Sequence, residues 1–252
     1  MTLFDVRRVL LLCATLAAAS RGAQAQRDVR ENVNAWFTWF GDIEVDERWS
    51  VDYDVSLRRS GPLDEPAQSL WRVGIRRNVS PNVRIAIGYA GSLTYPYGEV
   101  PIAYRTPEHR IWENVQLSHA VWRLLVTHRY RIEQRWSGRV GLVNGEETVQ
   151  NWVRTNRGRY LARATVPLQG GTLDADEWFV NASSEVFLSW GANVQQNVLD
   201  QHRLQGTVGR RIGTRARLEL GFLEQLVQKP NGRQLERNHT LMTIATTSFG
   251  SR

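Results

Sequence analysis

A row of charged side chains near the middle of the chain carries more chemistry than any other part of this sequence. Every second residue is polar, with Leu125 as the one break, and the row consists of Arg123, Thr127, Arg129, Arg131, Glu133 and Arg135. Side chains at alternate positions of a β-strand share one face. Arg guanidinium groups pair with carboxylates and phosphates through planar, two-pronged hydrogen bonds. The row therefore predicts a strand face built for ion pairs or for binding anions.

Segments further along the chain carry charged side chains in a matching alternation. The residues that we assign to the same face are Arg159, Arg163, Glu185, Arg203, Arg217 and Glu219. An Arg that faces lipid at the middle of a bilayer costs roughly 2–4 kcal/mol, so in a membrane barrel these rows must face the lumen. Two interpretations remain open. The charges either neutralise one another as Arg–Glu ion pairs that fill a narrow lumen, or they line a pore that attracts anions.

The elements that position these rows are strands with one apolar and one polar face. Between Arg48 and Arg58 every odd position is apolar and every even position is polar. This alternation, repeated along the chain, is typical of an outer-membrane β-barrel with lipid outside and a polar lumen inside. We predict strands at approximately residues 33–45, 48–59, 70–79, 83–93, 108–118, 121–136, 152–167, 177–190, 199–211, 215–228 and 237–249.

The connections between these segments alternate between mostly tight turns and longer loops, as periplasmic turns and extracellular loops do in such barrels. The longer loops are predicted at residues 60–69, 91–107, 137–151, 191–198 and 229–236. Eleven segments conflict with the even strand number of bacterial single-chain barrels. We therefore predict an all-β, antiparallel up-and-down transmembrane barrel with about twelve strands, one of them unrecognised, and ten as the alternative.

Tryptophan spacing gives an independent measure of strand length. Trp178 and Trp190 are twelve residues apart and share a face. Twelve residues of a tilted strand climb roughly 30 Å, which matches two aromatic girdles around an apolar band about 25 Å tall. The predicted girdle residues are Trp49, Trp71, Trp122, Trp136, Trp152, Trp178 and Trp190. A soluble β-sandwich with large core Trp residues is the alternative.

The first 25 residues have the pattern of a secretory signal peptide. An apolar run from residue 9 to residue 19 follows Arg7 and Arg8, and Ala23-Gln24-Ala25 fits the small-x-small cleavage rule. We predict cleavage after Ala25 and one barrel domain over residues 26–252. The single cysteine, Cys13, leaves with the signal, so no disulfide or cysteine metal site is expected. The five histidines lack metal-ligand spacing, and no cofactor is expected.

The number and distribution of the charged residues limit the classes of partner that we expect. The formal net charge is +7, and Lys229 is the only lysine. Because the Arg residues are interleaved along strands and not gathered on a helix or tail, we expect no nucleic-acid partner. Arg groups near the cell surface suit the phosphates of lipopolysaccharide. The expected partners are outer-membrane lipid, lipopolysaccharide and, during biogenesis, the barrel-assembly machinery.

Several short segments along the chain form a distinctive set: Asn34-Ala35-Trp36-Phe37, Gly41-Asp42-Ile43, Trp49-Ser50, Arg58-Arg59, Glu108-His109-Arg110-Ile111-Trp112, residues 128–136, Arg157-Gly158-Arg159-Tyr160, Glu185-Val186-Phe187, Asp200-Gln201-His202-Arg203 and Asn238-His239. Together they resemble the domain-of-unknown-function 2490 family of predicted Gram-negative outer-membrane barrels. The resemblance covers essentially the whole mature chain, and the Arg-x-Arg-x-Glu-x-Arg run is its most specific part. It implies a barrel in the outer membrane and carries over no catalytic residues.

Two functions from different classes fit these features. The first is passive passage or binding of small polar or anionic solutes through the Arg-lined lumen. The second is a structural or envelope-surface barrel with a plugged lumen that acts through its long loops. A hydrolase or acyltransferase at the barrel rim is a weaker hypothesis, based on Ser118 beside His119 or on Asp200 near His202, because a catalytic trio needs convergence across strands. We expect the protein not to be an enzyme.

Overall fold

The computed structural model describes residues 28–61, 63–194 and 198–250. The predicted signal peptide lies outside the described residues. The part of the chain that the structure describes contains no helix with the length and hydropathy needed to cross a bilayer.

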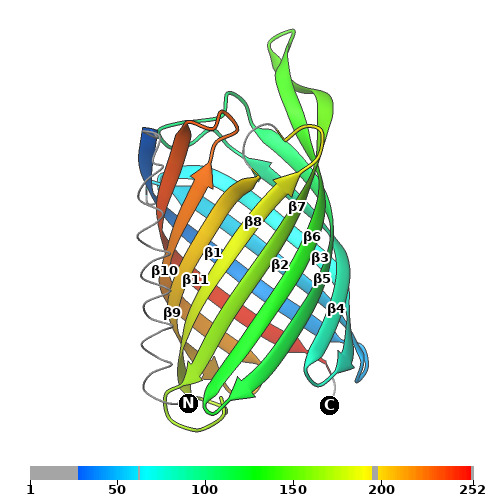
Figure 1. Ribbon diagram of the computed structural model, residues 1–252, viewed down its shortest axis with the longest axis vertical. Helices are drawn as coiled ribbons and strands as arrows, with labels where there is room; N and C mark the ends of the chain where they lie inside the picture. Colours follow the sequence, from blue (N-terminus) through cyan, green and yellow to red (C-terminus); the bar gives the residue numbers. More distant parts are fainter. Residues whose placement is uncertain (1–27, 62, 195–197, 251–252) are drawn as a thin grey trace, which may run out of the picture.

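Eleven strands make up the fold, and they close into a single barrel (Figure 1). The strands are β1 (Asp28–Glu44), β2 (Trp49–Ser60), β3 (Glu65–Ser80), β4 (Val83–Thr94), β5 (Thr106–Val121), β6 (Leu124–Val143), β7 (Glu146–Pro167), β8 (Trp178–Trp190), β9 (Leu199–Ile212), β10 (Ala216–Gln228) and β11 (Gln234–Phe249). Each strand pairs in antiparallel fashion with the next along the chain. The all-β barrel predicted from the alternation is confirmed.

The number of strands differs from the prediction because of how the barrel closes. β1 and β11 run parallel, with Asp28 opposite Gln234 at one end and Ile43 opposite Phe249 at the other. A fully antiparallel closed barrel needs an even number of strands, whereas one parallel pair removes that requirement. The predicted twelve strands and the alternative of ten are therefore both wrong. β1 starts at the end of the barrel opposite to the end where β11 stops.

The two ends of the barrel carry different connections. Short turns at residues 45–48, 81–82, 122–123 and 213–215 lie at what we call the turn end, together with the longer connection 168–177. The opposite end, the loop end, carries residues 95–105, 191–194 and 229–233.

The prediction of a loop at residues 137–151 is wrong, because these residues are mostly strand. β6 and β7 run beyond their neighbours and project from the loop end as a hairpin (Figure 1). Asn144 and Gly145 form its tip with φ values of 52° and 87°. Two consecutive positive φ values at Asn-Gly are typical of a two-residue hairpin turn, which lets both strands continue to the tip. The predicted loop at residues 60–69 likewise shrinks to 61–64.

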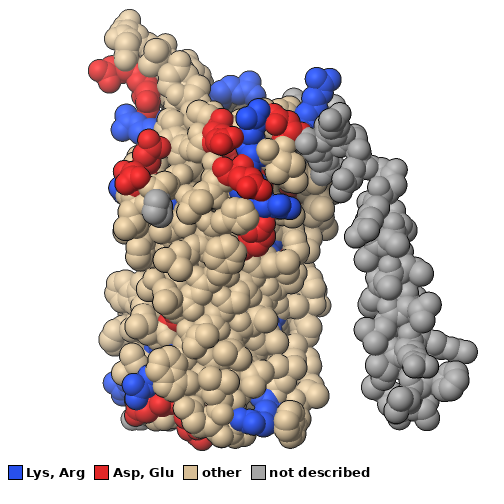
Figure 2. All heavy atoms as spheres, turned by 90° about the vertical axis from the view of Figure 1, so that its left-hand side faces the viewer, with Lys and Arg blue, Asp and Glu red and all other residues tan. Residues whose placement is uncertain are grey.

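The alternation of side chains separates an apolar outside from a polar inside. Outward-facing residues such as Ile75, Ile87 and Leu220 are more than half exposed, whereas the inward-facing Glu133 and Asn238 are buried. Figure 2 shows charged side chains gathered towards the two ends of the barrel, with a broad band largely free of charge between them. Many hydrophobic residues of this fold thus lie on its surface, and its interior is largely polar, with one apolar cluster formed by Trp36, Leu223, Met242 and Ile244.

The parallel closure predicts a specific cross-link. Phe37 lies directly opposite Thr243 across β1 and β11, while Phe249 lies opposite Ile43, six residues further along. Paired strands are about 5 Å apart, which suits a disulfide, whereas six residues along a strand span about 20 Å. In a Cys13→Ser background, we expect oxidation to cross-link the pair Phe37→Cys/Thr243→Cys, seen as faster migration on non-reducing denaturing gels. The pair Phe37→Cys/Phe249→Cys is the control, and cross-linking of neither pair would contradict the closure.

Candidate functional site: an arginine-rich cavity inside the barrel

Ion pairs fill the middle of the lumen. Glu185 on β8 accepts hydrogen bonds from Arg129 at 2.9 Å and from Arg159 at 2.8 Å. Arg159 on β7 also donates to Glu133 on β6 at 2.8 Å. Glu133 is 1% exposed. Because unpaired charges are strongly disfavoured in a closed interior, these groups hold the facing strands in one arrangement.

A second cluster lies on the turn-end side of this layer. Glu219 accepts from Arg163 at 2.9 Å, and it also accepts hydrogen bonds from Asn181 and Thr207. Across the barrel, Arg76 pairs with Asp42 at 3.3 Å and with Asp52 at 3.2 Å.

A third cluster lies on the loop-end side. Glu108 on β5 pairs with Arg110 on the same strand and with Arg135 on β6 at 2.6 Å. Arg157 on β7 pairs with Asp200 on β9, also at 2.6 Å. Arg110, Arg135 and Arg157 therefore each have a carboxylate partner.

Aromatic side chains support several of the lumen arginines. The Arg58 guanidinium lies 4.0 Å from the ring centre of Trp36, and Arg203 lies 5.0 Å from Trp36 and 4.8 Å from Phe187. Guanidinium groups stack favourably on aromatic faces, which fixes their planes.

Trp112 is a third aromatic side chain that points into the barrel, and two glycines leave space for it. Trp112 lies against Gly74 and Gly88, where an added Cβ would come within 2.6 Å of the indole. Arg131 stacks on its other side, at 4.6 Å. The two glycines therefore leave room for the indole inside the barrel.

Most of the predicted lumen residues take part in these contacts. Those that do are Arg129, Arg131, Glu133, Arg135, Arg159, Arg163, Glu185, Arg203 and Glu219. Arg123 does not: it lies in the β5–β6 turn and donates to the carbonyls of Pro167 and Gly170. The preceding Trp122 has a φ of 55°, so the strand predicted from residue 121 begins only after this turn. Arg217 lies near the turn end of β10, exposed and without an ion pair among the described residues.

Sequence reasoning missed several residues of the interior. They are Trp36, Arg58, Arg72, Glu108, Arg110, Trp112, Lys229 and Glu236. The sequence does indicate the inward position of two of these residues, because Trp36 and Trp112 have the same parity as the polar residues of their own strands. The size and apolar character of Trp favour an outward position and so conflict with this parity.

Six of the seven predicted girdle tryptophans lie on the outer face of a strand, whereas Trp122 lies exposed in the β5–β6 turn. Trp49, Trp122 and Trp178 stand at the turn end, each with an Arg side chain near its ring. The others, Trp71, Trp136, Trp152 and Trp190, lie in the loop-side halves of their strands. Trp39 also faces outward and was not predicted.

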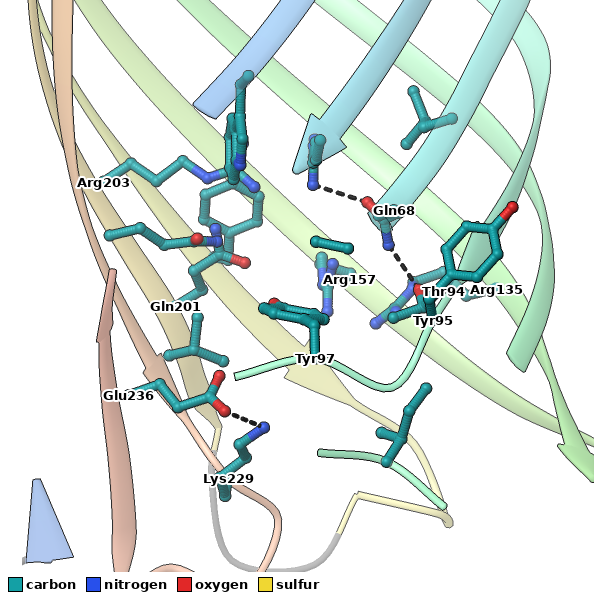
Figure 3. A pocket seen from close by; sticks show the side chains of 18 of the residues that line it. Gln68, Thr94, Tyr95, Tyr97, Arg135, Arg157, Gln201, Arg203, Lys229 and Glu236 are labelled. Carbon is teal, nitrogen blue, oxygen red and sulfur yellow. Dashed lines mark hydrogen bonds and ion pairs between the residues drawn. The ribbon is translucent and has the colours of Figure 1, made fainter. Parts of the chain in front are cut away.

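A cavity of about 220 Å³ lies on the loop-end side of the side chains of Trp36 and Phe187, which form part of its lining. Cationic side chains dominate its lining: Arg58, Arg72, Arg110, Arg135, Arg157, Arg159, Arg203 and Lys229. Glu236 is the one carboxylate residue of the lining, and it pairs with Lys229 at 2.6 Å. Figure 3 shows the labelled side chains around this space, with the Lys229–Glu236 pair on one side and Gln68 with Thr94 on the other. We call this space the loop-end cavity.

The β4–β5 segment, residues 95–105, contributes Tyr95, Tyr97, Val100 and Ile102 to the same cavity. The segment is held from two sides: Asn32 accepts from the Glu99 backbone N–H at 3.1 Å, and Lys229 donates to the Val100 carbonyl at 3.4 Å. Burial raises the pKa of the Tyr97 phenol, which keeps it a neutral hydroxyl.

A second cavity, of about 210 Å³, lies towards the turn end. Its lining mixes three carboxylates with five arginines, so its excess of positive charge is smaller than that of the loop-end cavity; these residues are Asp42, Asp52, Asp54, Arg72, Arg76, Arg84, Arg129 and Arg131. Arg72 is the one residue that lines both cavities, and its ion pair with Asp54, at 2.7 Å, lies in the layer between them. The lumen therefore holds two chambers.

The residues considered for hydrolysis or metal binding do not converge. Ser118 bonds Thr127, whereas His119 stacks on His128. Asp200 bonds Arg157 and Ser189, whereas His202 bonds Ser184. Among the described residues, no group of three or more His, Cys, Asp or Glu is arranged to hold a metal ion.

The central ion pairs predict a large, position-specific loss of stability. Glu185→Gln leaves Arg129 and Arg159 without the charge that both contact. Breaking a buried pair from one side costs about 3–5 kcal/mol. We expect a clearly lower urea concentration for loss of the folded band on unheated gels. Glu65→Gln, at an exposed position at the start of β3, is the matched control and should leave the midpoint unchanged. Equal midpoints for the two variants would contradict a structural role for the central layer.

Comparison with known proteins gives a family and nothing closer. No curated protein and no solved structure matches the chain. The model of a family described as protein of unknown function, DUF2490, matches residues 33–236, which reach from β1 to the start of β11. The match agrees with the resemblance carried by the Arg-rich segments. On this evidence the chain belongs to the DUF2490 family.

Proposed function

We propose that this protein is an outer-membrane barrel of a Gram-negative bacterium that binds small anionic solutes in its arginine-lined lumen. The observation that carries the proposal is the loop-end cavity, where eight cationic side chains and one carboxylate residue line a closed-walled space. Three separate arguments support it: the outer surface, the charge of the cavity and the division of the lumen.

The outer surface supports insertion into a membrane. Exposed apolar residues occur on every strand, far beyond the isolated patches normal for a soluble monomer. A closed barrel leaves no unpaired strand edge along its paired length, which is the condition for spanning lipid with strands. Trp residues at both ends of the outward-facing rows suit the two interfaces of a bilayer. The predicted signal peptide would direct export, after which the barrel-assembly machinery and lipopolysaccharide are the expected partners.

The charge of the loop-end cavity supports an anionic ligand. Within a low-dielectric wall, an excess of positive charge attracts anions more strongly than it would in water. Arg groups bind carboxylate and phosphate oxygens with fixed geometry, and stacking on Trp36 and Phe187 fixes the guanidinium planes in advance. An anion entering from the loop end would therefore meet preorganised donors.

The division of the lumen supports binding over free diffusion. The two cavities are separated by the Arg72–Asp54 pair and the cluster around Glu185. A solute that crosses would have to displace these ion pairs. We therefore expect a low conductance at rest.

A second candidate is a plugged envelope barrel that acts through its surface. The projecting β6–β7 hairpin favours it, because Leu142 and Val143 near its tip are exposed. The long segment 95–105 supports this candidate less, because its Tyr95 and Tyr97 line the cavity. If this candidate is correct, a strain in which Asn-Gly replaces residues 140–149 should show the same envelope phenotype as a strain that lacks the protein. Anion binding by the shortened barrel should equal that of the wild type.

Membrane insertion predicts opposite effects at neighbouring positions. Leu220 is 57% exposed and faces outward, whereas Glu219 is buried in the lumen. An Arg in the lipid-facing band costs roughly 2–4 kcal/mol. We expect Leu220→Arg to abolish the heat-shifted band in the outer-membrane fraction, and Glu219→Gln to retain most of it. Equal loss in both variants, or a folded protein in the soluble fraction, would overturn the assignment.

Anion binding is tested on the purified full-length barrel in detergent. We expect acetate, benzoate or inorganic phosphate to change tryptophan fluorescence in a saturable manner at constant ionic strength, because Trp36 lines the cavity. Choline and Mg²⁺ serve as cationic controls and should give no saturable change. Planar-bilayer recordings measure conductance in parallel. If no anion binds and no anion-selective current appears, the proposed function fails.

A further inference from the structure

We infer that the loop-end cavity takes a compact aromatic carboxylate, with Arg58 as the residue that receives its carboxylate group. This inference rests on the proposed function and adds the class of ligand and the residue that recognises it.

Arg58 stands apart from the other cations of the cavity because it forms no ion pair with any carboxylate in the described part of the chain. One hydrogen bond, from Nη1 to Gln68 Oε1 at 2.7 Å, and the stack on Trp36 hold it in place. Its Nε has no acceptor, and neither does the Nε of Arg157 in the same lining, so the missing carboxylate is what distinguishes Arg58. A guanidinium in the interior without a counter-charge favours an added oxyanion, because an uncompensated charge there is costly.

Gln68 fixes the orientation of this receptor. Its amide nitrogen donates to Thr94 Oγ1 at 2.7 Å, so its carbonyl oxygen is the atom turned towards Arg58. The series of hydrogen bonds from Thr94 through Gln68 to Arg58 connects β4, β3 and β2. Gln68 is thus a positioning residue, since it supports the guanidinium without forming an ion pair.

The remaining charge suits a ligand with a single negative charge. Arg110 and Arg135 share Glu108, Arg157 pairs with Asp200, and Lys229 pairs with Glu236. Arg203 lies 3.9 Å from Glu185, a carboxylate that also binds Arg129 and Arg159. Because several of these cations share a carboxylate, the cavity as a whole carries an excess of positive charge. Arg58 is the one lining cation with no carboxylate partner among the described residues, and a monocarboxylate matches that single position.

Besides the charged residues and the polar Gln68, Thr94, Gln201 and Gln225, the lining has an apolar and aromatic part. This part includes Trp36, Ala67, Leu70, Tyr95, Tyr97, Val100, Ile102, Phe187 and Val227. Such a wall gains little from a small hydrated anion and more from an apolar ring attached to one. A cavity of about 150 Å³ holds benzene. The space of about 220 Å³ thus accommodates one ring with a carboxylate group.

The experiment measures benzoate binding by the folded full-length barrel in detergent, using isothermal titration calorimetry. Inorganic phosphate and the neutral benzyl alcohol are the comparison probes. We expect saturable benzoate binding, and binding of the two comparison probes at least about tenfold weaker, since each lacks one of the two matching features.

Variants locate the site. Arg58→Gln should weaken benzoate binding by about ten- to hundredfold, because a hydrogen-bonded charge partner is lost. Arg84→Gln is the matched control: Arg84 lines only the turn-end cavity, and we expect benzoate affinity to stay at the wild-type value. Val100→Trp changes a residue of the β4–β5 segment, outside the strands, and should block binding by filling the cavity. It keeps the test decisive if Arg58→Gln does not give a heat-shifted folded band.

Each outcome separates the inference from the proposed function. Phosphate binding as tight as benzoate binding would overturn the aromatic-carboxylate class and leave anion binding intact. Equal losses in the Arg58 and Arg84 variants, or full binding in Val100→Trp, would overturn the location. Absence of binding for every anion would overturn the proposed function together with the inference.

Discussion

The structure depends on neutralising arginine inside a closed sheet. Arg159 on β7 bridges the buried Glu133 and Glu185, and Arg129 on β6 also pairs with Glu185, so these contacts connect strands that lie next to one another in the wall. A buried carboxylate that lost its arginines, or the reverse, would cost several kcal/mol. The ion pairs therefore hold a large part of the interior together, beside the apolar cluster of Trp36, Leu223, Met242 and Ile244. This constraint also explains why the lumen is divided, because the shared carboxylates lie between the two chambers.

Closure of the barrel is the second constraint, and it is met without an even number of strands. β1 pairs with β2 on one side and with β11 on the other, so both of its edges are satisfied despite the parallel direction of the seam. Inside, Asn32 on β1 donates to Asn238 on β11 at 2.9 Å, and Asn238 donates in turn to Gln225 on β10. These buried amides cross the seam and continue into the next pair of strands. The seam is thus held by side chains as well as by the backbone.

The loop-end cavity follows from these two constraints and from one loop. The central layer forms its floor, Trp36 and Phe187 set the planes of the arginines above that layer, and residues 95–105 contribute the side chains of Tyr97 and Val100. Most cations around the space are paired, so its selectivity depends on the few that are less compensated. The proposed preference for a carboxylate with a small apolar body is a consequence of that pairing pattern and of the aromatic wall.

The sequence alone determined the fold class, the approximate position of each of the eleven strands and the lumen-facing parity of residues such as Arg159 and Glu185. It could do so because a period of two is a local property that each strand expresses by itself. The tertiary structure decided the parallel closure of β1 on β11, the inward position of Trp36 and Trp112, and the absence of a carboxylate partner for Arg58 among the described residues. These features depend on which residues from distant strands meet across the lumen, and on space made locally by Gly74 and Gly88. Alternation along one strand carries no information about either.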